Sequence, residues 1–214
     1  MNSVQNNWIE SGVSMFGMWE SLQGLRRITK DIAIGETVSG ADRENENLSA
    51  VYRENYSSKT LLKLKNFGID VVTYPFFRGF GVCNEQATRN GFFTVATKCR
   101  KHGLKIGGYV SLSPVFKESL FQEFPEAESW TQVNQSGQSN FYGGRQTYRV
   151  KLCKNNPDFR AFIKTVLHDL VIKGKADLVH FDHVNDHPEP YSCHCPHCRQ
   201  KFVEFVRNTL TPAE

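Results

Sequence analysis

The chain has 214 residues, enough for one sizeable core or two small ones, and its 39% hydrophobic and 22% charged residues are typical of a folded globular protein. Its 26 basic and 22 acidic side chains leave a net charge of +4, too small and too scattered to indicate nucleic-acid binding. No stretch approaches the ~18 apolar residues of a membrane span, and residues 1–12 lack the features of a signal peptide. We therefore expect a soluble, cytoplasmic protein with neither a membrane nor a nucleic-acid partner.

Strand-like and helix-like segments alternate through the first half of the chain. Runs rich in β-branched residues at 69–74 and 104–110 each follow a glycine and predict strands. Between them, residues 91–102 predict an amphipathic helix, because apolar side chains recur at i, i+3, i+4 and i+7. The predicted inward face of this helix consists of Phe92, Val95, Ala96 and Cys99. Cys99 is therefore expected in the core rather than in a catalytic site.

The strongest helix signal begins at residue 156. Asn156 is a favoured N-cap, Pro157 suits the first helical position, and Gly174 ends the segment. The apolar stripe between them consists of Phe159, Phe162, Ile163, Val166, Leu167, Leu170 and Val171. A stripe of this spacing predicts a helix with one buried face.

Two further elements are expected after this helix. Residues 176–181 predict a buried strand with Asp182 at its C-terminal end. A last helix is expected from about Cys198, with an inward face made of Phe202, Phe205 and Val206. Repeated helix-then-strand units of this kind indicate an α/β fold with a parallel sheet.

In parallel β/α folds the functional residues lie in loops at the C-terminal ends of the strands. The candidate loops here are residues 75–85, 111–118 and 182–191. The polar segment 123–149 is expected to be a long excursion that covers the same face. By domain, we expect residues 1–55 to form an N-terminal lead-in with room for a first barrel strand, and residues 56–214 to form the β/α part.

A short run of cysteines indicates a metal site. Residues 193–198 read Cys-His-Cys-Pro-His-Cys, which places three thiols at C-x-C-x2-C spacing. Structural zinc sites bind the ion tetrahedrally through four cysteine or histidine side chains. The predicted ligands are Cys153, Cys193, Cys195 and Cys198. An iron–sulfur cluster or a disulfide could use the same thiols, and His194 or His197 could replace a cysteine, although we expect both to be exposed.

The order of these features resembles a known enzyme family. From about residue 67 to 205 the chain is similar to the first half of the TIM-barrel glycoside hydrolases related to the family 42 β-galactosidases. The matching segments are strands at 68–72 and 103–106, a Pro-Glu segment at 124–126, a helix start within 148–158 and the zinc loop at 193–198. In that family a cysteine about 40 residues before the loop completes the zinc site, and Cys153 precedes Cys193 by 40 positions.

The resemblance implies a (β/α)8 TIM-barrel fold, of which this chain holds about the N-terminal half, together with a carbohydrate substrate and structural Zn2+. One departure is important. The family carries an Asn-Glu pair whose glutamate, the acid/base, lies about nine residues before the first loop cysteine, and here His183 and Val184 occupy these positions. Val184 cannot transfer a proton. The chain therefore looks more like poorly characterised bacterial barrel families assigned as glycosidases, in which a strand ends in Phe-Asp.

Asp182 is the candidate catalytic residue. Hydrolysis of a glycosidic bond usually needs two carboxyl groups, and an apolar strand before Asp182 could tune its pKa. The alternative is a structural aspartate that accepts hydrogen bonds from loop amides or a nearby histidine. Candidate substrate-binding residues are Glu85, Tyr109, His183 and Asn185. Glu85 could equally cap the helix near Thr88, the Tyr109 ring could equally pack in the core, and His183 could join His187 and Asp182 at a second metal.

The chain is short for the barrel that the resemblance implies. A complete barrel needs ~250 residues or more, and by the resemblance the second catalytic carboxyl group lies on a later strand. We expect the fragment to be inactive alone, and the apolar edges of an open half-barrel to favour a homo-oligomer. Two other classes stay open. One is a degenerate barrel that binds carbohydrate without hydrolysis, and the other is a zinc-dependent module that binds nucleic acid or protein.

Overall fold

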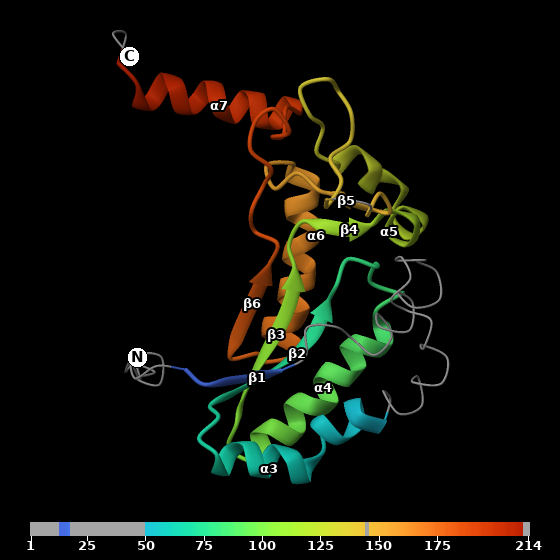
Figure 1. Cartoon of the computed structure of the whole chain (residues 1–214), viewed down its shortest axis with the longest axis vertical. Coiled ribbons are helices and arrows are strands. Elements are labelled where there is room, and N and C mark those ends of the chain that lie inside the picture. Colours follow the sequence, from blue (N-terminus) through green and yellow to red (C-terminus); the bar gives the residue numbers. More distant parts are fainter. Residues whose placement is uncertain (1–12, 18–49, 144–145, 212–214) are drawn as a thin grey trace. The chain divides into compact units, whose positions relative to one another are not determined.

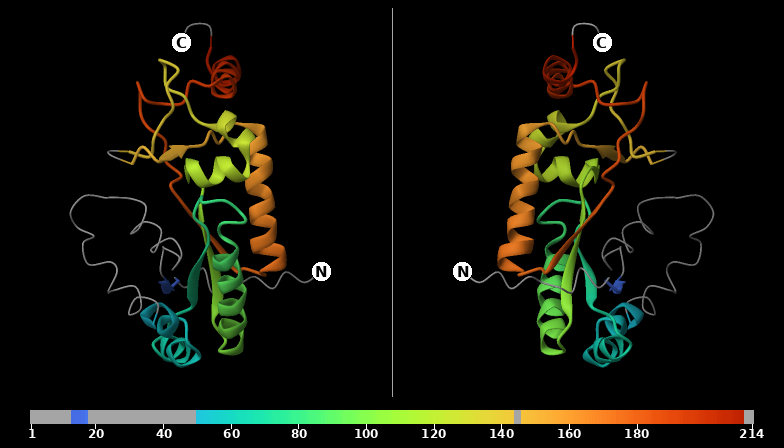
Figure 2. Two further views of the ribbon diagram at one scale, coloured as in Figure 1. Left: turned by 90° about the vertical axis from the view of Figure 1, so that its right-hand side faces the viewer. Right: turned by 90° about the vertical axis from the view of Figure 1, so that its left-hand side faces the viewer.

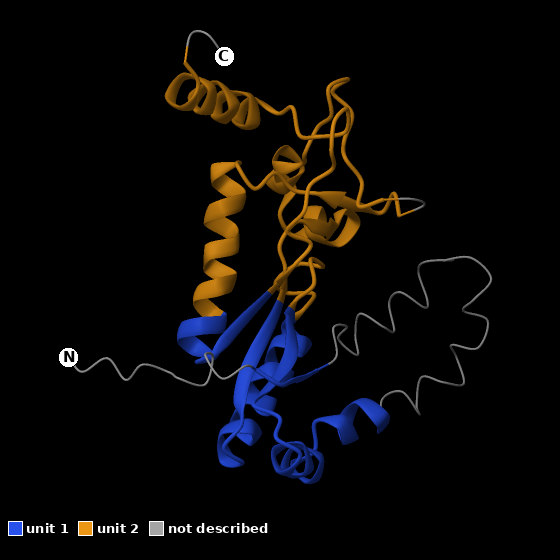
Figure 3. Ribbon diagram, turned by 60° about the vertical axis from the view of Figure 1, so that its left-hand side comes forward, with its two compact units in different colours: residues 1–76, 86–109, 170–180 blue, residues 77–85, 110–169, 181–214 orange. Residues whose placement is uncertain are grey.

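The computed structural model of the chain describes residues 13–17, 50–143 and 146–211 (Figures 1 and 2). Contacts divide the chain into two compact units (Figure 3). Unit 1 consists of residues 1–76, 86–109 and 170–180, and unit 2 consists of residues 77–85, 110–169 and 181–214.

A four-stranded sheet has the order β1-β2-β3-β6. Its strands are β1 (Met15–Gly17), β2 (Val71–Phe77), β3 (Lys105–Ser111) and β6 (Leu178–Asp182). β1 pairs with β2 in parallel, and the β2, β3 and β6 arrows run in the same direction in Figure 1. The predicted strands at 69–74 and 104–110 correspond to β2 and β3. The structure confirms an α/β fold with a parallel sheet.

Unit 1 packs helix α4 (Gln86–Lys101) alongside the strands, as Figures 1 and 2 show, and α3 (Ser58–Asn66) contacts α4. The predicted inward face of α4 is confirmed, because its four apolar residues are all buried. The Phe92 ring meets the Phe76 ring of β2 edge-on, with 5.2 Å between centroids. The helix begins five residues before the predicted start at 91. Its first turns include Arg89, which is buried with its guanidinium 4.9 Å from the Phe76 ring centre, a contact that apolar spacing does not reveal.

A close backbone approach explains one glycine of β3. A Cβ built on Gly108 would lie 2.3 Å from Cδ1 of Leu170, so a larger residue would collide with that side chain. Leu170 is fully buried in unit 1. The glycine therefore allows the side chain to pack directly on the strand backbone.

Helix α6 (Pro157–His168) in unit 2 starts as the sequence predicts. The Asn156 side chain accepts hydrogen bonds from the main-chain N–H groups of Asp158 and Phe159, and Pro157 opens the helix. A π-helical turn, η2 (Asp169–Lys173), continues it toward Gly174. The core of unit 2 gathers around Phe162, whose ring contacts Phe77, Phe124 and Trp130.

The polar segment 123–149 contains more structure than a loop excursion. It follows α5 (Lys117–Glu123) and contains the 3-10 helix η1 (Pro125–Trp130). The adjoining strands β4 (Pro114–Phe116) and β5 (Arg149–Lys151) form an antiparallel pair, and isolated bridges such as Phe141 to Val150 extend this pairing. The candidate loop at 111–118 is therefore partly a strand.

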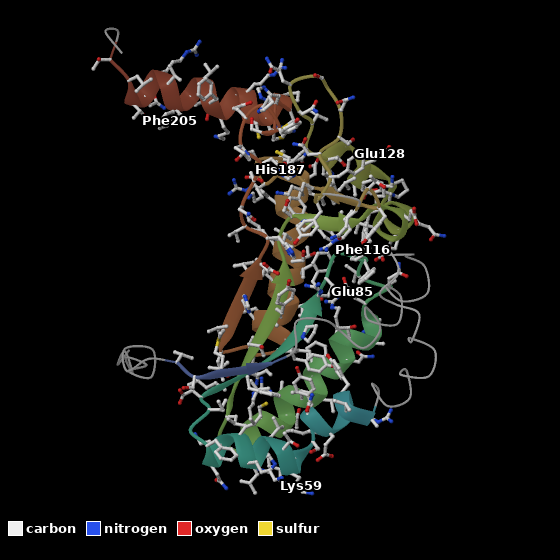
Figure 4. The ribbon with its side chains drawn as sticks, viewed as in Figure 1. Lys59, Glu85, Phe116, Glu128, His187 and Phe205 are labelled. Carbon is white, nitrogen blue, oxygen red and sulfur yellow. The ribbon has the colours of Figure 1, made fainter. Side chains whose placement is uncertain are left out.

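Two predictions of burial are wrong, one for the strand at 176–181 and one for the apolar face of the last helix. β6 is only partly buried, and Phe181 is 40% exposed, because β6 ends the strand order and has no further strand beside it among the described residues. Helix α7 (Pro196–Thr209) has no buried residue, and Phe202 and Phe205 are 66% and 55% exposed (Figure 4). The apolar stripe of α7 exists as predicted, but no described segment covers it.

The expected lead-in at 1–55 lies outside the described residues except for positions 13–17 and 50–55. Of the helices that the structure does describe, none combines the length and the apolar character needed to cross a bilayer.

Candidate metal centre and active site

The structure brings the four predicted metal ligands together in unit 2. Cys153 lies between β5 and α6. Cys193 comes from the loop that leads into α7, Cys195 is the N-cap of that helix, and Cys198 lies in its first turn. All four sulfur atoms lie within 4.8 Å of one another. The Cys153 Sγ atom is 3.4 Å from Cys195 Sγ and 3.5 Å from Cys198 Sγ. The predicted clustering of the four cysteines is confirmed.

These sulfur–sulfur distances suit a single metal ion. A disulfide requires ~2.05 Å between sulfur atoms, and all six cysteines of the chain are free thiols. Zn–S bonds of ~2.3 Å place tetrahedral sulfur ligands roughly 3.8 Å apart, close to the spacing seen here. Asn155 adds an outer contact, because its Nδ2 donates to Cys198 Sγ at 3.3 Å.

The thiols also influence one another electrostatically. A hydrogen bond from the Cys153 thiol lowers the pKa of Cys193 to about 5, whereas that contact and burial raise the pKa of Cys153. Burial raises the pKa of Cys198 to about 11. Negative charge therefore concentrates on one sulfur, and a bound cation is what would allow several thiolates to occupy this small volume.

The two histidines of the loop are not among the clustered ligands. His194 is part-buried, and its Nε2 lies 3.1 Å from Glu189 Oε2 and 3.2 Å from Ser192 Oγ. His197 is also partly buried. Neither has the full exposure that the sequence predicts.

A second group of polar side chains surrounds the end of β6. The main-chain N–H of His183 donates to Asp182 Oδ1 at 2.6 Å, and His183 Nδ1 lies 3.4 Å from both Asp182 Oδ2 and Ser111 Oγ. His183 Nε2 is 2.9 Å from the Tyr142 hydroxyl. His183 has a φ of +60°, a left-handed conformation that is unusual for a residue other than glycine. This backbone turn places the ring over the carboxylate that precedes it.

Burial lowers the pKa of His183 to about 4. The Asp182 carboxylate opposes this shift, while the cations of Arg149, Arg78 and Lys151 reinforce it. The ring is therefore neutral at pH 7. A neutral ring that donates through Nδ1 toward Asp182 accepts through Nε2 from Tyr142, and this tautomer satisfies all of the contacts.

Tyr142 and Arg149 are members of this group that sequence reasoning missed. The Arg149 guanidinium lies 4.4 Å from the Tyr142 ring centre and 5.0 Å from that of Phe116, a cation–π arrangement on two rings. Tyr142 precedes β5 and Arg149 is its first residue, and they lie 41 and 34 positions from His183. Their local sequence carries no motif, so only the tertiary structure reveals the group.

Glu85, which Figure 4 labels, is buried, and its carboxylate accepts hydrogen bonds from three main-chain N–H groups. Its Oε1 accepts from Arg78 N at 2.6 Å, and its Oε2 accepts from Gly79 N at 3.1 Å and Phe80 N at 3.0 Å. Burial raises its pKa to about 7, against the opposing effect of these N–H groups and of the Arg78 charge. The carboxylate thus organises the turn after β2.

The other predicted site residues are held as follows. Tyr109 belongs to unit 1, is 1% exposed, and its ring meets His180 edge-on at 5.3 Å. Asn185 is exposed, and its main-chain carbonyl accepts a hydrogen bond from Lys151 Nζ at 3.0 Å. His187 Nε2 lies 2.8 Å from the Phe141 carbonyl. Within the described ranges, the cysteines are the one close group of three or more metal-ligand side chains, so a second metal at Asp182, His183 and His187 is not supported.

Comparison with known proteins gives a fold but no family. No family model matches the chain, and no curated protein does. Two family 36 α-galactosidases from Geobacillus stearothermophilus match at TM-scores of 0.52 and 0.51, with 16% and 17% identity over 90% and 89% of this chain. An α-galactosidase from Lactobacillus brevis matches at 0.50, with 14% identity over 73%.

These matches cover 24%, 30% and 23% of the three enzymes, so the chain spans less than a third of their length. At such identities the likeness concerns the fold. The chain is an α/β protein whose parallel sheet and helices are similar to part of a TIM-barrel glycoside hydrolase.

Proposed function

We propose that this chain is part of a glycoside hydrolase of the β/α-barrel type, that residues 56–214 form the β/α region, and that Asp182 is one of two catalytic carboxyl groups. One observation carries the proposal. Asp182 ends a parallel strand in a fold similar to glycosidase barrels, and the chain then enters the loop of the four-cysteine cluster. Catalytic groups in such folds lie at this end of the strands.

The arrangement around Asp182 suits a carboxylate that is held in one orientation. Its side chain is 30% exposed, so a ligand can reach it, while His183 contacts both of its oxygens. His183, neutral at pH 7, acts as a positioning residue and is itself held by Tyr142. Among the described residues we assign no second catalytic carboxyl group, because Glu85 and Asp186 are occupied by main-chain or side-chain donors. Residues 1–214 alone are therefore proposed to be inactive.

We propose that the four cysteines bind a structural zinc ion, as the resemblance to the family 42 zinc loop implies. Their spacing around one point supports a single ion, since an iron–sulfur cluster holds its cysteines around several metal atoms. When bound, Zn2+ supplies a cross-link without redox chemistry. It would tie the loop after β6 to the segment that starts α6. The proposed cytoplasmic setting would keep these cysteines reduced, as metal binding requires.

Hydrolysis can be tested on the native gene product with p-nitrophenyl glycosides. We expect Asp182→Asn to lower kcat/KM by roughly 10²–10⁴-fold, the usual contribution of a positioned acid or base. Glu128→Gln is the matched control, because Glu128 is an exposed carboxylate in η1 (Figure 4). Wild-type kcat/KM in Asp182→Asn would exclude the catalytic role. Turnover by residues 1–214 alone would contradict the proposed need for a further carboxyl group.

A second candidate is a barrel that binds carbohydrate without hydrolysing it. Val184 stands where the resembling family has its acid/base and is 56% exposed, and the Asp182 carboxylate already accepts a main-chain hydrogen bond. This candidate predicts sugar affinity with no turnover, even in the complete gene product.

A further inference from the structure

Unit 2 contains a cleft of about 600 Å3 that lies outside the Asp182 group and the cysteine cluster. This volume falls within the ~300–1,000 Å3 typical of small-molecule sites. One part of the lining comes from the polar segment before β5 and the other from the loop after β6. The lining residues that matter here are Gln138, Ser139, Asn140, Phe141, His187 and Tyr191.

The two parts of the lining are tied to each other by hydrogen bonds. Asn140, which is only 5% exposed, donates through Nδ2 to the Tyr191 carbonyl at 2.9 Å. His187 Nε2 lies 2.8 Å from the Phe141 carbonyl. A carbonyl oxygen only accepts, so His187 Nε2 carries the hydrogen of this bond. The cleft is therefore held in shape before any ligand arrives, which reduces the entropy lost on binding.

The chemistry of the lining favours a neutral, hydroxyl-rich ligand. The exposed amide of Gln138 and hydroxyl of Ser139 can both donate and accept hydrogen bonds, as a polyol requires. Among the described lining residues none is Asp, Glu, Lys or Arg. A phosphate or carboxylate ligand would lack a charged partner in this cleft.

Two aromatic rings complete the lining. Tyr191 is 60% exposed and Phe141 is 37% exposed, so both keep ring surface accessible. Lys117 Nζ lies 5.7 Å from the Phe141 ring centre, which makes Tyr191 the more open of the two. An aromatic face beside neutral hydrogen-bonding groups suits a pyranose ring, which has apolar C–H faces and a polar rim.

We infer that this cleft binds an uncharged saccharide unit, with the Tyr191 ring as its stacking platform. The inference rests on the proposed function for the class of ligand. Phe141 is followed by Tyr142, whose hydroxyl contacts His183 beside Asp182, so the chain connects the cleft directly to the proposed catalytic group. The cleft would hold a part of the glycan that does not react, and binding there would position the reacting bond.

Binding is tested by isothermal titration of the 214-residue chain with maltotriose, cellotriose and galactotriose, and with trigalacturonic acid as a charged comparison. Tyr191→Ala should weaken binding of the neutral sugar at least tenfold, or about 1.4 kcal/mol. Tyr191→Phe, which keeps the ring, should bind within about threefold of wild type. Phe67→Ala is the matched control, since Phe67 is 84% exposed and lies in unit 1. Gln138→Ala should also weaken binding of the neutral sugar, because it removes a hydrogen-bonding group from the lining.

The outcomes separate this inference from the proposed function. No binding of any neutral trisaccharide by ~10 mM, where even a millimolar site is filled, would overturn the inference, as would unchanged affinity in Tyr191→Ala or preference for trigalacturonic acid. Turnover by the native gene product with no effect of Tyr191→Ala would reject the cleft and retain the hydrolase. Loss of sugar affinity in Tyr191→Ala but not in Asp182→Asn, with no turnover, would support the cleft and reject catalysis.

Discussion

His183 combines a left-handed backbone with a part-buried ring that faces one carboxylate and three cations. The left-handed backbone and the burial of the ring each cost free energy, and the contacts with Asp182 and Tyr142 offset part of that cost. The sequence indicates only a histidine after a strand that ends in aspartate. Its lowered pKa comes first from burial, and the charges of Arg149, Arg78 and Lys151, which lie between 32 and 105 positions away, add to the shift.

The lowered pKa of His183 predicts a pH-dependent stability. Between about pH 6.5 and pH 4 the unfolded chain binds a proton that the folded chain does not, so the free energy of unfolding falls as the pH falls through this window. The expected loss is roughly 1–3 kcal/mol. His183→Asn should remove it, and asparagine also adopts the left-handed backbone more readily. Urea unfolding at pH 7, 6, 5 and 4 measures the effect.

The matched control is His168→Asn, because the His168 side chain is 61% exposed. The acidic groups that titrate in the same range, Glu85 among them, are common to all three proteins and cancel in the differences. If the free energy of unfolding depends on pH in the same way in wild type and in His183→Asn, then burial does not hold His183 neutral.

At the scale of elements, α4, α6 and α7 show where periodic patterns succeed and fail. All three carry an apolar stripe at helical spacing. The stripes of α4 and α6 are buried, as at Phe92 and Phe159, whereas the stripe of α7 is exposed. Amphipathic spacing states which side of a helix prefers to be covered. Whether a covering segment exists is a property of the rest of the fold.

The same residue type on two helices gives a direct test. Phe159→Ala on α6 should cost about 3–5 kcal/mol, because Phe159 is 1% exposed and its removal leaves a cavity. Phe205→Ala on α7 should change the free energy of unfolding by less than about 0.5 kcal/mol, because that ring is 55% exposed. Denaturant unfolding of the two variants measures both values. Comparable losses would mean that α7 packs its apolar face in solution.

At the scale of the whole molecule, the cysteine cluster joins parts of unit 2 that lie 40 or more positions apart. A metal ion there stabilises the folded chain because the unfolded chain has no preformed site. Zinc binding is therefore expected to stabilise unit 2 as well as the loop after β6.

We expect one zinc ion per chain by elemental analysis of purified protein. Cys195→Ser should lose the metal and lower Tm, while Cys83→Ser, an exposed cysteine outside the cluster, should keep both. Retention of stoichiometric zinc in Cys195→Ser would exclude the cluster as the site. Iron in place of zinc in the wild-type protein would redirect the proposal to iron–sulfur chemistry.

Features that depend on neighbours along the chain could be predicted without a structure. The Asn156 cap, the Pro157 start of α6 and the buried face of α4 follow from local hydrogen bonding and the 3.6-residue helical period. The ligand set of the cysteine cluster was also predictable, because few arrangements other than a metal site explain three thiols at this spacing with a fourth well upstream.

Which polar groups contact each other became known only from the folded chain. Tyr142 reaches His183 from 41 positions away, three main-chain N–H groups occupy Glu85, and the cleft at Tyr191 is formed by two separate segments. The exposure of α7 and β6 was decided in the same way. The physical reason is that hydrogen bonding and burial depend on which distant segment arrives at a surface, and a pattern of neighbours along the chain does not contain that information.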